Sequence, residues 1–331
     1  MEYERDKCPC CGSGNYGFLY NLSYGSVNKC VDCLTAYTVF KDPDILSLNE
    51  TFGGKDFLKA RIYDQYEFRR IARNRLCFLS KFVNSGEILE FGSSTGEFLY
   101  EAAGKGYKVS SVDLHPVVLS INKTNNLQDI VESNAIHFKA KKTYEAIVAF
   151  HLIEHLADPA GFLSNCRMSL KPGGVIFIEV PNFSSFTRKI LGKRSGMFYD
   201  YHICHFDKDS LGRLMKKCGY EVIAVRTIDD PVRYIAPIYN PLRHGLWYLL
   251  RKFRKQNKGN ICEDKSGNSN TRTTAKDEVD ILNSRKAKIY RLESGFIRVI
   301  SMAFLPVCML LDKYYLGSGL QVIAKRTKSE E

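Results

Sequence analysis

The stretch ILEFGSSTGEF, residues 88–98, begins with an apolar run, turns through small residues and enters a segment of helix formers. This order predicts a buried strand, a tight turn and the start of a helix. Gly92 suits a backbone that takes a positive φ or comes close to a ligand, because glycine has no Cβ. The N–H groups at a helix start suit polar or anionic ligand atoms. The stretch therefore predicts a ligand-binding turn at the end of a strand.

A second predicted strand, residues 109–113, ends in the carboxylate of Asp113. Nucleoside-binding α/β folds place at this point the acid that accepts hydrogen bonds from the ribose hydroxyls. The alternative for Asp113 is an ordinary strand-end carboxylate. The glycines alone are also compatible with a dinucleotide oxidoreductase, so the motifs further along the chain have to distinguish the two classes.

Three motifs in sequence order resemble those of class I S-adenosylmethionine-dependent methyltransferases. Glu90-x-Gly92-x-Ser94-x-Gly96 is similar to the first motif, (D/E)-x-G-x-G-x-G, with serine in place of the middle glycine. YEAIVAFHLIEHLADP, residues 144–159, resembles the fourth strand and following loop of one group of these enzymes. LKPGGVIFIEVPN, residues 170–182, resembles its next turn and fifth strand. The resemblance implies a methyltransferase with S-adenosylmethionine as cofactor.

The resemblance also implies roles for residues near these motifs. The turn would approach the amino-acid part of the cofactor, with Glu90 beside its amino group. Asp113 would accept from the ribose and Leu114 would flank the adenine. Asn134 lies where the family often carries an acidic residue, and His151 would contact the cofactor. The expected cofactor-binding residues are Glu90, Gly92, Ser93, Ser94, Gly96, Asp113, Leu114, Asn134 and His151.

His151-x-x-Glu154-His155 follows the predicted fourth strand, at the edge where open α/β sheets bind ligands. A helical segment would place both histidines on one face. Three interpretations remain: cofactor and substrate contact with His155 as a base, divalent-metal binding by His151, Glu154 and His155, and a hydrogen-bonded structural turn.

The segment YDYHICHF, residues 199–206, resembles an H-x-x-H-F segment of the same group. Histidine has an unperturbed pKa near 6.5, so either His202 or His205 could act as the general base for a hydroxyl acceptor. A structural, hydrogen-bonded histidine is the alternative for each. The candidate catalytic residues are therefore His155, His202 and His205.

Two C-x-x-C pairs near the N-terminus have the spacing of a metal site. Cys8, Cys11, Cys30 and Cys33 could supply four thiolates to a tetrahedral structural zinc ion, although Cys10 offers a competing sulfur. Reduced thiols without metal are the alternative. Short β segments beside the cysteines favour a zinc ribbon. Such a module ahead of a methyltransferase domain is similar to sugar C-methyltransferases and to methyltransferases of bacterial polysaccharide biosynthesis.

Strand and helix patterns alternate from residue 87 to 180, and two further strands are predicted at 220–226 and 320–325. The expected fold is α/β: a Rossmann-like, seven-stranded, mostly parallel sheet with helices on both faces, a small N-terminal zinc ribbon and a helical C-terminal insertion. The expected divisions are a zinc-ribbon module at 1–45, a linker with helices at 46–86, the methyltransferase core at 87–230, a basic and apolar insertion with a mobile loop at 231–318, and a last strand and tail at 319–331.

The net charge of +12 favours an acidic partner, such as nucleic acid, a phosphorylated substrate or an anionic membrane. Residues 242–255 have the pattern of a basic amphipathic helix. Residues 295–311 are apolar but interrupted by Arg298 and Pro306, which favours a buried or partner-facing helix over a membrane span. Eleven cysteines and no secretory signal indicate a cytoplasmic protein, with peripheral contact at the inner membrane face as an option.

The combined motifs predict a methyltransferase that acts on a hydroxyl of a sugar or lipid-linked glycan in surface-polysaccharide or related metabolism. The alternatives are methylation of a quinone or lipid, methylation of RNA, and a non-catalytic zinc-ribbon adaptor with a degenerate fold. Nucleic acid is disfavoured because the chain lacks the Asn/Asp-Pro-Pro-aromatic signature of base-amine methylation. The sequence does not indicate an oligomeric state.

Overall fold

The computed structural model describes residues 7–42, 65–114, 130–229, 299 and 302–327. The chain divides into two compact units, Met1–Asp229 with Leu310–Glu331, and Asp230–Met309. The architecture and the site described below belong to the first unit.

The centre of this unit is a seven-stranded sheet with the order β10-β11-β8-β7-β4-β5-β6. Neighbours from β8 through β6 pair in parallel, whereas β11 runs antiparallel to both β8 and β10. The predicted mostly parallel sheet is confirmed. Its strands are β4 (Glu87–Phe91), β5 (Lys108–Asp113), β6 (Ile130–Glu132), β7 (Tyr144–Phe150), β8 (Leu170–Pro181), β10 (Tyr220–Ile228) and β11 (Gly319–Arg326).

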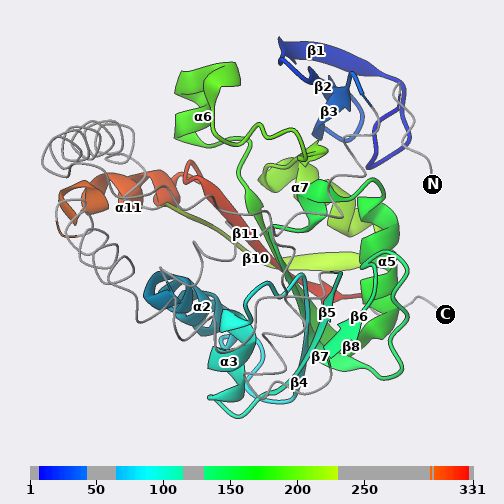
Figure 1. Ribbon diagram of the computed structural model, residues 1–331, viewed down its shortest axis with the longest axis vertical. Coiled ribbons are helices and arrows are strands. Elements are labelled where there is room, and N and C mark those ends of the chain that lie inside the picture. The colour runs from blue at the N-terminus through cyan, green and yellow to red at the C-terminus, as the bar shows by residue number, and fades with distance from the viewer. Residues whose placement is uncertain (1–6, 43–64, 115–129, 230–298, 300–301, 328–331) are drawn as a thin grey trace, which may run out of the picture. The chain divides into compact units, whose positions relative to one another are not determined.

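Helices cover both faces of this sheet, as Figure 1 shows. Successive residues of a strand point to opposite faces, and β4 divides its side chains accordingly. Ile88 joins a buried cluster with α2 and α3, whereas Leu89 joins one with α5 and α7. These helices are α2 (Gln65–Leu79), α3 (Glu97–Ala103), α5 (Pro159–Ser169) and α7 (Lys208–Lys217).

Shorter helices complete the described elements. These are α6 (Phe186–Leu191), α11 (Leu305–Lys313) and the 3₁₀ helices η2 (Ile153–His155), η3 (Gly192–Arg194) and η4 (Met302–Phe304).

A second, four-stranded sheet has the order β1-β2-β3-β9 and is antiparallel throughout. Its strands are β1 (Tyr16–Asn21), β2 (Gly25–Cys30), β3 (Ala36–Phe40) and β9 (Cys204–His205). β1 and β3 confirm the predicted β segments beside the cysteines, and β2 is a further strand between them. The fourth comes from the predicted H-x-x-H-F segment, with His205 opposite Ala36 and Cys204 opposite Tyr37. This pairing, which the sequence did not predict, joins the cysteine module to the loops of the main sheet.

Several sequence predictions lie outside the described residues. These are the basic amphipathic helix at 242–255 and the mobile loop expected within the insertion at 231–318. Within the apolar segment at 295–311, the description covers residue 299 and then 302 onward, where α11 begins at Leu305. None of the helices in the described ranges is long and apolar enough to cross a membrane.

Candidate active site

The turn after β4 takes the left-handed backbone that its composition predicts. Gly92 has a φ of 72° and Gly96 a φ of 78°, and Ser94, which replaces the family's middle glycine, has a φ of 49°. Residues other than glycine adopt a positive φ only at an energetic cost. Ser94 therefore keeps the backbone conformation of the glycine that it replaces. A Cβ placed on Gly92 would lie 3.5 Å from Cδ1 of Leu152. The loop after β7 therefore packs directly against the turn.

Two carboxylates border this turn. Asp113, at the end of β5, accepts a hydrogen bond of 3.2 Å from the backbone N–H of Ser94. Glu90, on β4, is only 3% exposed. Carboxylates suit a cationic amino group and a ribose diol, so the groups present fit the two polar ends of S-adenosylmethionine. The roles of these residues in cofactor binding stay predictions.

The remaining expected cofactor residues lie near Asp113. The Ser111 hydroxyl donates to the Ser93 hydroxyl over 2.7 Å beneath the turn. Leu114 is 45% exposed, which leaves its side chain available to a ring. Asn134 follows β6, and the amide of the preceding residue donates to the Asp113 carbonyl. Its own Oδ1 accepts from the Ile136 N–H over 2.9 Å, so this oxygen stabilises the local turn.

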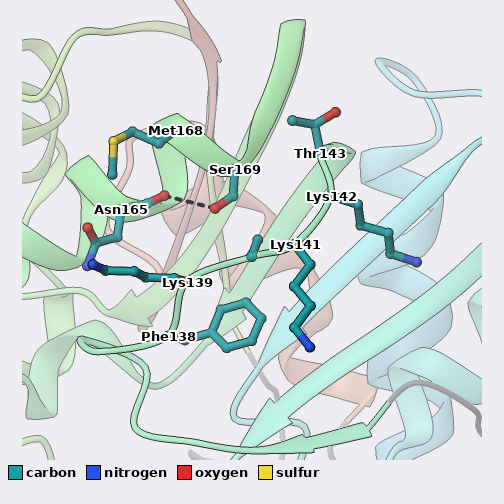
Figure 2. Close-up of a pocket in the computed structure, with 9 residues that line it drawn as sticks. Phe138, Lys139, Lys141, Lys142, Thr143, Asn165, Met168 and Ser169 are labelled. Atoms are coloured by element: carbon teal, nitrogen blue, oxygen red, sulfur yellow. Dashed lines mark hydrogen bonds between the residues drawn. The ribbon is translucent and has the colours of Figure 1, made fainter.

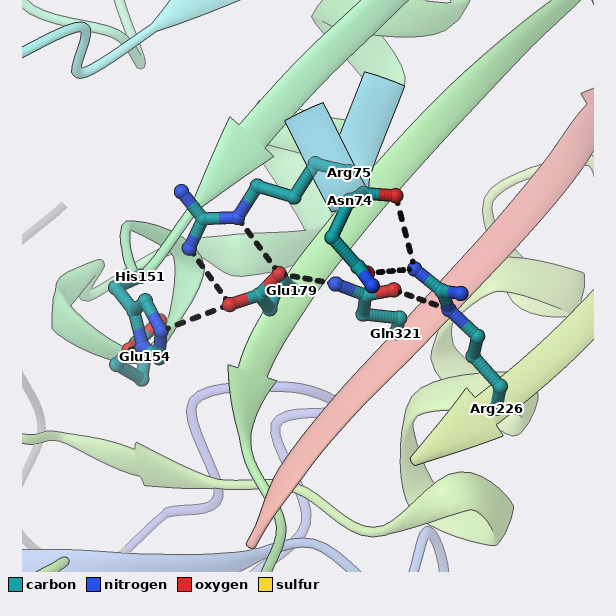
Figure 3. A network of polar contacts seen from close by, with 7 residues as sticks. All are labelled: Asn74, Arg75, His151, Glu154, Glu179, Arg226 and Gln321. Atoms are coloured by element: carbon teal, nitrogen blue, oxygen red, sulfur yellow. Dashed lines mark hydrogen bonds and ion pairs between the residues drawn. The ribbon is translucent and has the colours of Figure 1, made fainter. Parts of the chain in front are cut away.

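An ion network lies at the same edge of the sheet, in which the carboxylates of Glu154 and Glu179 are buried and His151 is 48% exposed (Figure 3). Glu179, on β8, accepts two hydrogen bonds from Arg75 of α2, of 2.8 Å from Nε and 2.6 Å from Nη2. His151 bridges two carboxylates, with Nε2 3.2 Å from Glu179 and Nδ1 3.3 Å from Glu154. Gln321 of β11 also donates to Glu179. Four elements are thereby linked through one buried carboxylate.

The network sets the charge of its members. Loss of water would lower the pKa of His151, but the hydrogen bonds to Glu154 and Glu179 outweigh this effect and raise it to about 9. Burial opposes ionisation of Glu179, yet the charge of Arg75 holds the pKa of that carboxyl well below its usual range. His151 is therefore an imidazolium at neutral pH, with both ring N–H groups directed to carboxylates. Its predicted contact with the cofactor stays a prediction.

The sequence did not identify Arg75 and Glu179. One signal was present, because Glu179 is an acidic residue inside the apolar strand segment VIFIEV, residues 175–180. A buried charge needs a partner, but the pattern does not show which of the many arginines supplies it.

The helical arrangement considered for residues 151–155 is wrong. His151 has a φ of 53°, and only Ile153–His155 form a turn of 3₁₀ helix. His151 consequently does not sit one helical turn below His155. Its ring faces Glu179, whereas the ring of His155 lies against residues 201 and 202.

His155 and His202 lie side by side, with ring centroids 4.8 Å apart. The Nδ1 atom of His155 is 3.1 Å from the Tyr201 carbonyl, and that of His202 is 2.8 Å from the Met197 carbonyl. Burial lowers the pKa of His202 to about 4, despite the nearby charge of Glu154. His202 is therefore neutral at physiological pH.

His205 occupies a different environment. Its Nε2 atom is 2.8 Å from the hydroxyl of Thr38 on β3, and the residue is only 2% exposed. Burial and the neighbouring His202 lower the pKa of His205 to about 3. The ring lies where the cysteine module meets the H-x-x-H-F segment, an arrangement compatible with the structural alternative. Its catalytic role is not tested by this geometry.

Beside the histidines, Tyr199 and Tyr201 stack with ring centroids 5.1 Å apart and an interplanar angle of 5°. Tyr199 is 46% exposed, and the ring of Tyr201 lies 5.5 Å from that of His155. The pair presents a flat aromatic surface next to the imidazoles.

The predicted thiolate quartet comes together in the structure. Sulfur atoms of Cys8, Cys11, Cys30 and Cys33 all lie within 4.8 Å of one another. The Cys8–Cys33 and Cys11–Cys30 sulfur pairs are each 3.5 Å apart. A tetrahedral zinc ion with Zn–S bonds of about 2.3 Å separates its sulfurs by roughly 3.8 Å, so the quartet fits such an ion. Cys10 does not belong to this group of four, and its sulfur lies 3.9 Å from that of Cys204.

A surface cavity of about 260 Å³ lies elsewhere (Figure 2). Its lining includes Lys139, Lys141 and Lys142, which precede β7, and Met168, near the end of α5. These residues lead into the amino ends of β7 and β8, and the glycine turn lies at the carboxyl ends. Lys142 pairs with Glu87 over 2.8 Å. The cavity is therefore separate from the candidate active site.

Known proteins resemble this chain over its central part. A family model described as a methyltransferase domain matches residues 63–225. A ubiquinone biosynthesis O-methyltransferase of Saccharophagus degradans is 28% identical over 107 residues, which are 30% of this chain and 45% of that protein. One from Xylella fastidiosa is 27% identical over 117 residues, 33% of this chain and 48% of that protein. The chain thus spans less than half of the length of the curated relatives it matches.

Solved structures also resemble it. A SAM-dependent methyltransferase from Archaeoglobus fulgidus is 18% identical, covers 78% of this chain and 94% of its own, and has a TM-score of 0.45. The family match places a methyltransferase domain at residues 63–225, and the glycine turn and the strand order fit the S-adenosylmethionine-dependent methyltransferase that the sequence predicts.

Proposed function

We propose that the protein is an S-adenosylmethionine-dependent methyltransferase that methylates a hydroxyl group of a sugar or glycan intermediate. One observation carries this proposal. The turn between Glu90 and Gly96 packs against Leu152, and the adjoining residues lead into the cluster of Glu154, His155 and His202. A predicted cofactor turn and a set of proton-accepting groups thus occupy neighbouring loops at one edge of the sheet.

This placement suggests separate roles for the cofactor, the residues that would hold it and the residues that would accept the proton. The cofactor supplies an electrophilic methyl group on a sulfonium. Asp113 would hold the ribose and Glu90 the amino group, which fixes the direction of the methyl. Alignment of this kind supplies several kcal/mol of the barrier to a bimolecular transfer. The hydroxyl proton would leave at the cluster of His155, His202 and Glu154, where a positioned base contributes about 10²–10⁴-fold.

Two features support a sugar on an anionic carrier as the acceptor. The stacked rings of Tyr199 and Tyr201 offer a flat apolar surface for the C–H face of a sugar ring. The net charge of +12 attracts the phosphates of a nucleotide-sugar or lipid-linked glycan. A peripheral position at an anionic membrane would suit the second of these carriers.

A quinol is the second candidate acceptor. The curated relatives are named ubiquinone biosynthesis O-methyltransferases, and an aromatic platform accommodates a phenol ring as well as a sugar. We further propose that the cysteine quartet holds a structural zinc ion, because four thiolates leave no coordination position open for a substrate.

A labelled-methyl assay with nucleotide-sugars, lipid-linked glycans and quinols tests the proposal. We expect transfer into one of the sugar pools; transfer into quinols alone would select the second candidate. Calorimetry with S-adenosylmethionine separates an enzyme from an adaptor, since a folded protein that does not bind the cofactor contradicts both candidates.

The Asp113→Asn variant tests whether Asp113 binds the ribose of the cofactor. Loss of a charged hydrogen bond, about 1.5–3 kcal/mol, should weaken cofactor binding by roughly 10- to 100-fold. Asp209→Asn, at an exposed aspartate of α7, is the matched control and should bind like the wild type.

A further inference from the structure

Glu154, His155 and His202 gather three metal-ligating side chains at one point. One ligand atom from each lies within 4.8 Å of the others. Glu154 and His155 belong to η2, after β7, and His202 precedes β9. The two segments are held together by a 2.8 Å hydrogen bond from the Ile203 N–H to the Glu154 carbonyl. The arrangement therefore has a backbone support of its own.

The two imidazoles are oriented as ligands are. A carbonyl oxygen can only accept a hydrogen bond, so the Nδ1 atoms facing Tyr201 and Met197 both carry protons. In a neutral ring the lone pair then resides on Nε2. Metal-binding histidines usually donate their other ring N–H to a carbonyl or carboxylate in this way, which fixes the tautomer.

The two carboxylate oxygens of Glu154 differ in their hydrogen bonding. Its side chain is 1% exposed, and Oε1 faces Nδ1 of the cationic His151 at 3.3 Å. Within the described part of the chain, Oε2 is buried and no hydrogen-bond partner reaches it. Leaving a buried anionic oxygen in this state costs about 1–3 kcal/mol or more. The structure therefore has a negative oxygen and two imidazole lone pairs in one place.

We propose that Glu154, His155 and His202 bind a first-row divalent transition-metal ion. Two imidazoles and one carboxylate leave positions open for an exogenous oxygen. This inference rests on the proposed function and puts an ion in place of its proton-accepting cluster. A hydroxyl bound to the ion would be the methyl acceptor, and because a metal ion lowers the pKa of a bound oxygen, the proton would leave to solvent water. The ligand set differs from the one considered from sequence, with His202 in place of His151.

Cobalt provides a probe that distinguishes this cluster from the cysteines. The full-length protein is loaded with one equivalent of Zn²⁺, which four thiolates bind in preference to the mixed cluster, and is then titrated with Co²⁺ while calorimetry and visible absorption are recorded. We expect one Co²⁺ per chain with ligand-field bands and without sulfur-to-cobalt charge-transfer bands.

Variants locate the ion. Glu154→Gln, which preserves side-chain size, and His202→Gln should each weaken Co²⁺ binding at least about 10-fold. His137→Gln, at an exposed histidine, is the matched control. Thermal unfolding adds a second readout: Co²⁺ should raise the melting temperature of the wild type and of the control, and should do so less in the two ligand variants.

Absence of Co²⁺ binding beyond the cysteine cluster overturns the inference, as do ligand variants that are folded and bind like the wild type. The methyl-transfer assay keeps the two proposals apart. Co²⁺ binding that depends on Glu154, without methylation of any acceptor, contradicts the proposed function alone. Methylation by a protein without the second ion contradicts the metal site alone.

Discussion

The cysteine quartet and the cluster of Glu154, His155 and His202 each bring their ligand atoms within 4.8 Å of one another, yet they are built differently. The quartet comes from two short motifs whose paired sulfurs are 19 and 25 residues apart in sequence. The second cluster joins loops whose contacting residues, His155 and Tyr201, are 46 residues apart. Four thiolates suit a closed structural site, whereas two imidazoles and one carboxylate leave room for a substrate oxygen.

The difference shows how each cluster depends on the rest of the molecule. The quartet cross-links the segment before β1 to the end of β2 and the turn that follows it. The second cluster is backed by the ion network of Arg75, Glu179 and His151, which spans the central sheet. Ligand removal should therefore unfold structure at the first cluster and change chemistry at the second.

The largest expected effect is at the quartet. Cys30→Ser removes one of four thiolates, and structural zinc contributes about 10–16 kcal/mol in small zinc-finger peptides. We expect loss of stoichiometric zinc and loss of hydrogen-exchange protection across residues 16–40. Cys77→Ser, at an exposed cysteine, is the control and should retain both. A zinc-free protein with a fully protected N-terminal sheet would remove the contrast between the two clusters.

The second effect concerns the support of the mixed cluster. Glu179→Gln leaves the guanidinium of Arg75 buried without its charge partner, which should lower the free energy of unfolding by about 3–5 kcal/mol. Denaturant titration measures this change. Lys171→Ala breaks the partly exposed pair with Glu145 and should cost no more than about 1 kcal/mol.

A double variant sharpens this test. Arg75→Met combined with Glu179→Gln removes both charges and should recover part of the stability lost in the single variant. An additive loss would mean that the ion pair is not what supports this edge of the sheet.

The smallest expected effect concerns Asp312, which belongs to neither cluster. This carboxyl should make the stability of the whole protein depend on pH, and the stability of variants in both clusters has to be compared at one pH for that reason. Burial raises the pKa of Asp312 to about 6, although hydrogen bonds from Thr227 and Asp229 oppose the shift. Between the unfolded value near 3.9 and about 6, the folded state binds the proton more tightly, so stability falls as pH rises through this window. The partly solvated carboxyl should contribute on the order of 1 kcal/mol.

Asp312→Asn should flatten this part of the stability profile and leave metal content unchanged, as judged from melting temperatures between pH 4 and 7. An unaltered profile would show that the slope in this window arises from groups other than Asp312.

Some of the site was legible in the sequence because its signals are local. Glycines at 92 and 96 predict a turn with positive φ, and the alternation of strand and helix patterns predicts a parallel sheet. The cysteine quartet was predictable for the same reason, since two C-x-x-C pairs carry their own geometry. In contrast, the helical interpretation of residues 151–155 failed, because the spacing of polar residues does not reveal the left-handed backbone at His151.

The partners of Glu179 and of the histidines could not be predicted from the sequence. Glu179 has its arginine 104 residues away, and His205 meets Thr38 167 residues away. Sequence spacing contains no information about such pairs without a known fold. They form only when strands far apart in the chain are brought to one edge.

By itself, the sequence determined most of the order of strands and helices, the glycine turn with Asp113 at the end of the next strand, and the grouping of four thiols, because backbone geometry and hydrophobic period act over a few residues. Tertiary structure decided that His151 faces Glu179, that His202 joins Glu154 and His155, and that β9 extends the cysteine-bearing sheet. Those outcomes depend on which chain segments come into contact when the protein folds. The protonation state and hydrogen bonds of a buried charge or lone pair are then set by the side chains of the other segment.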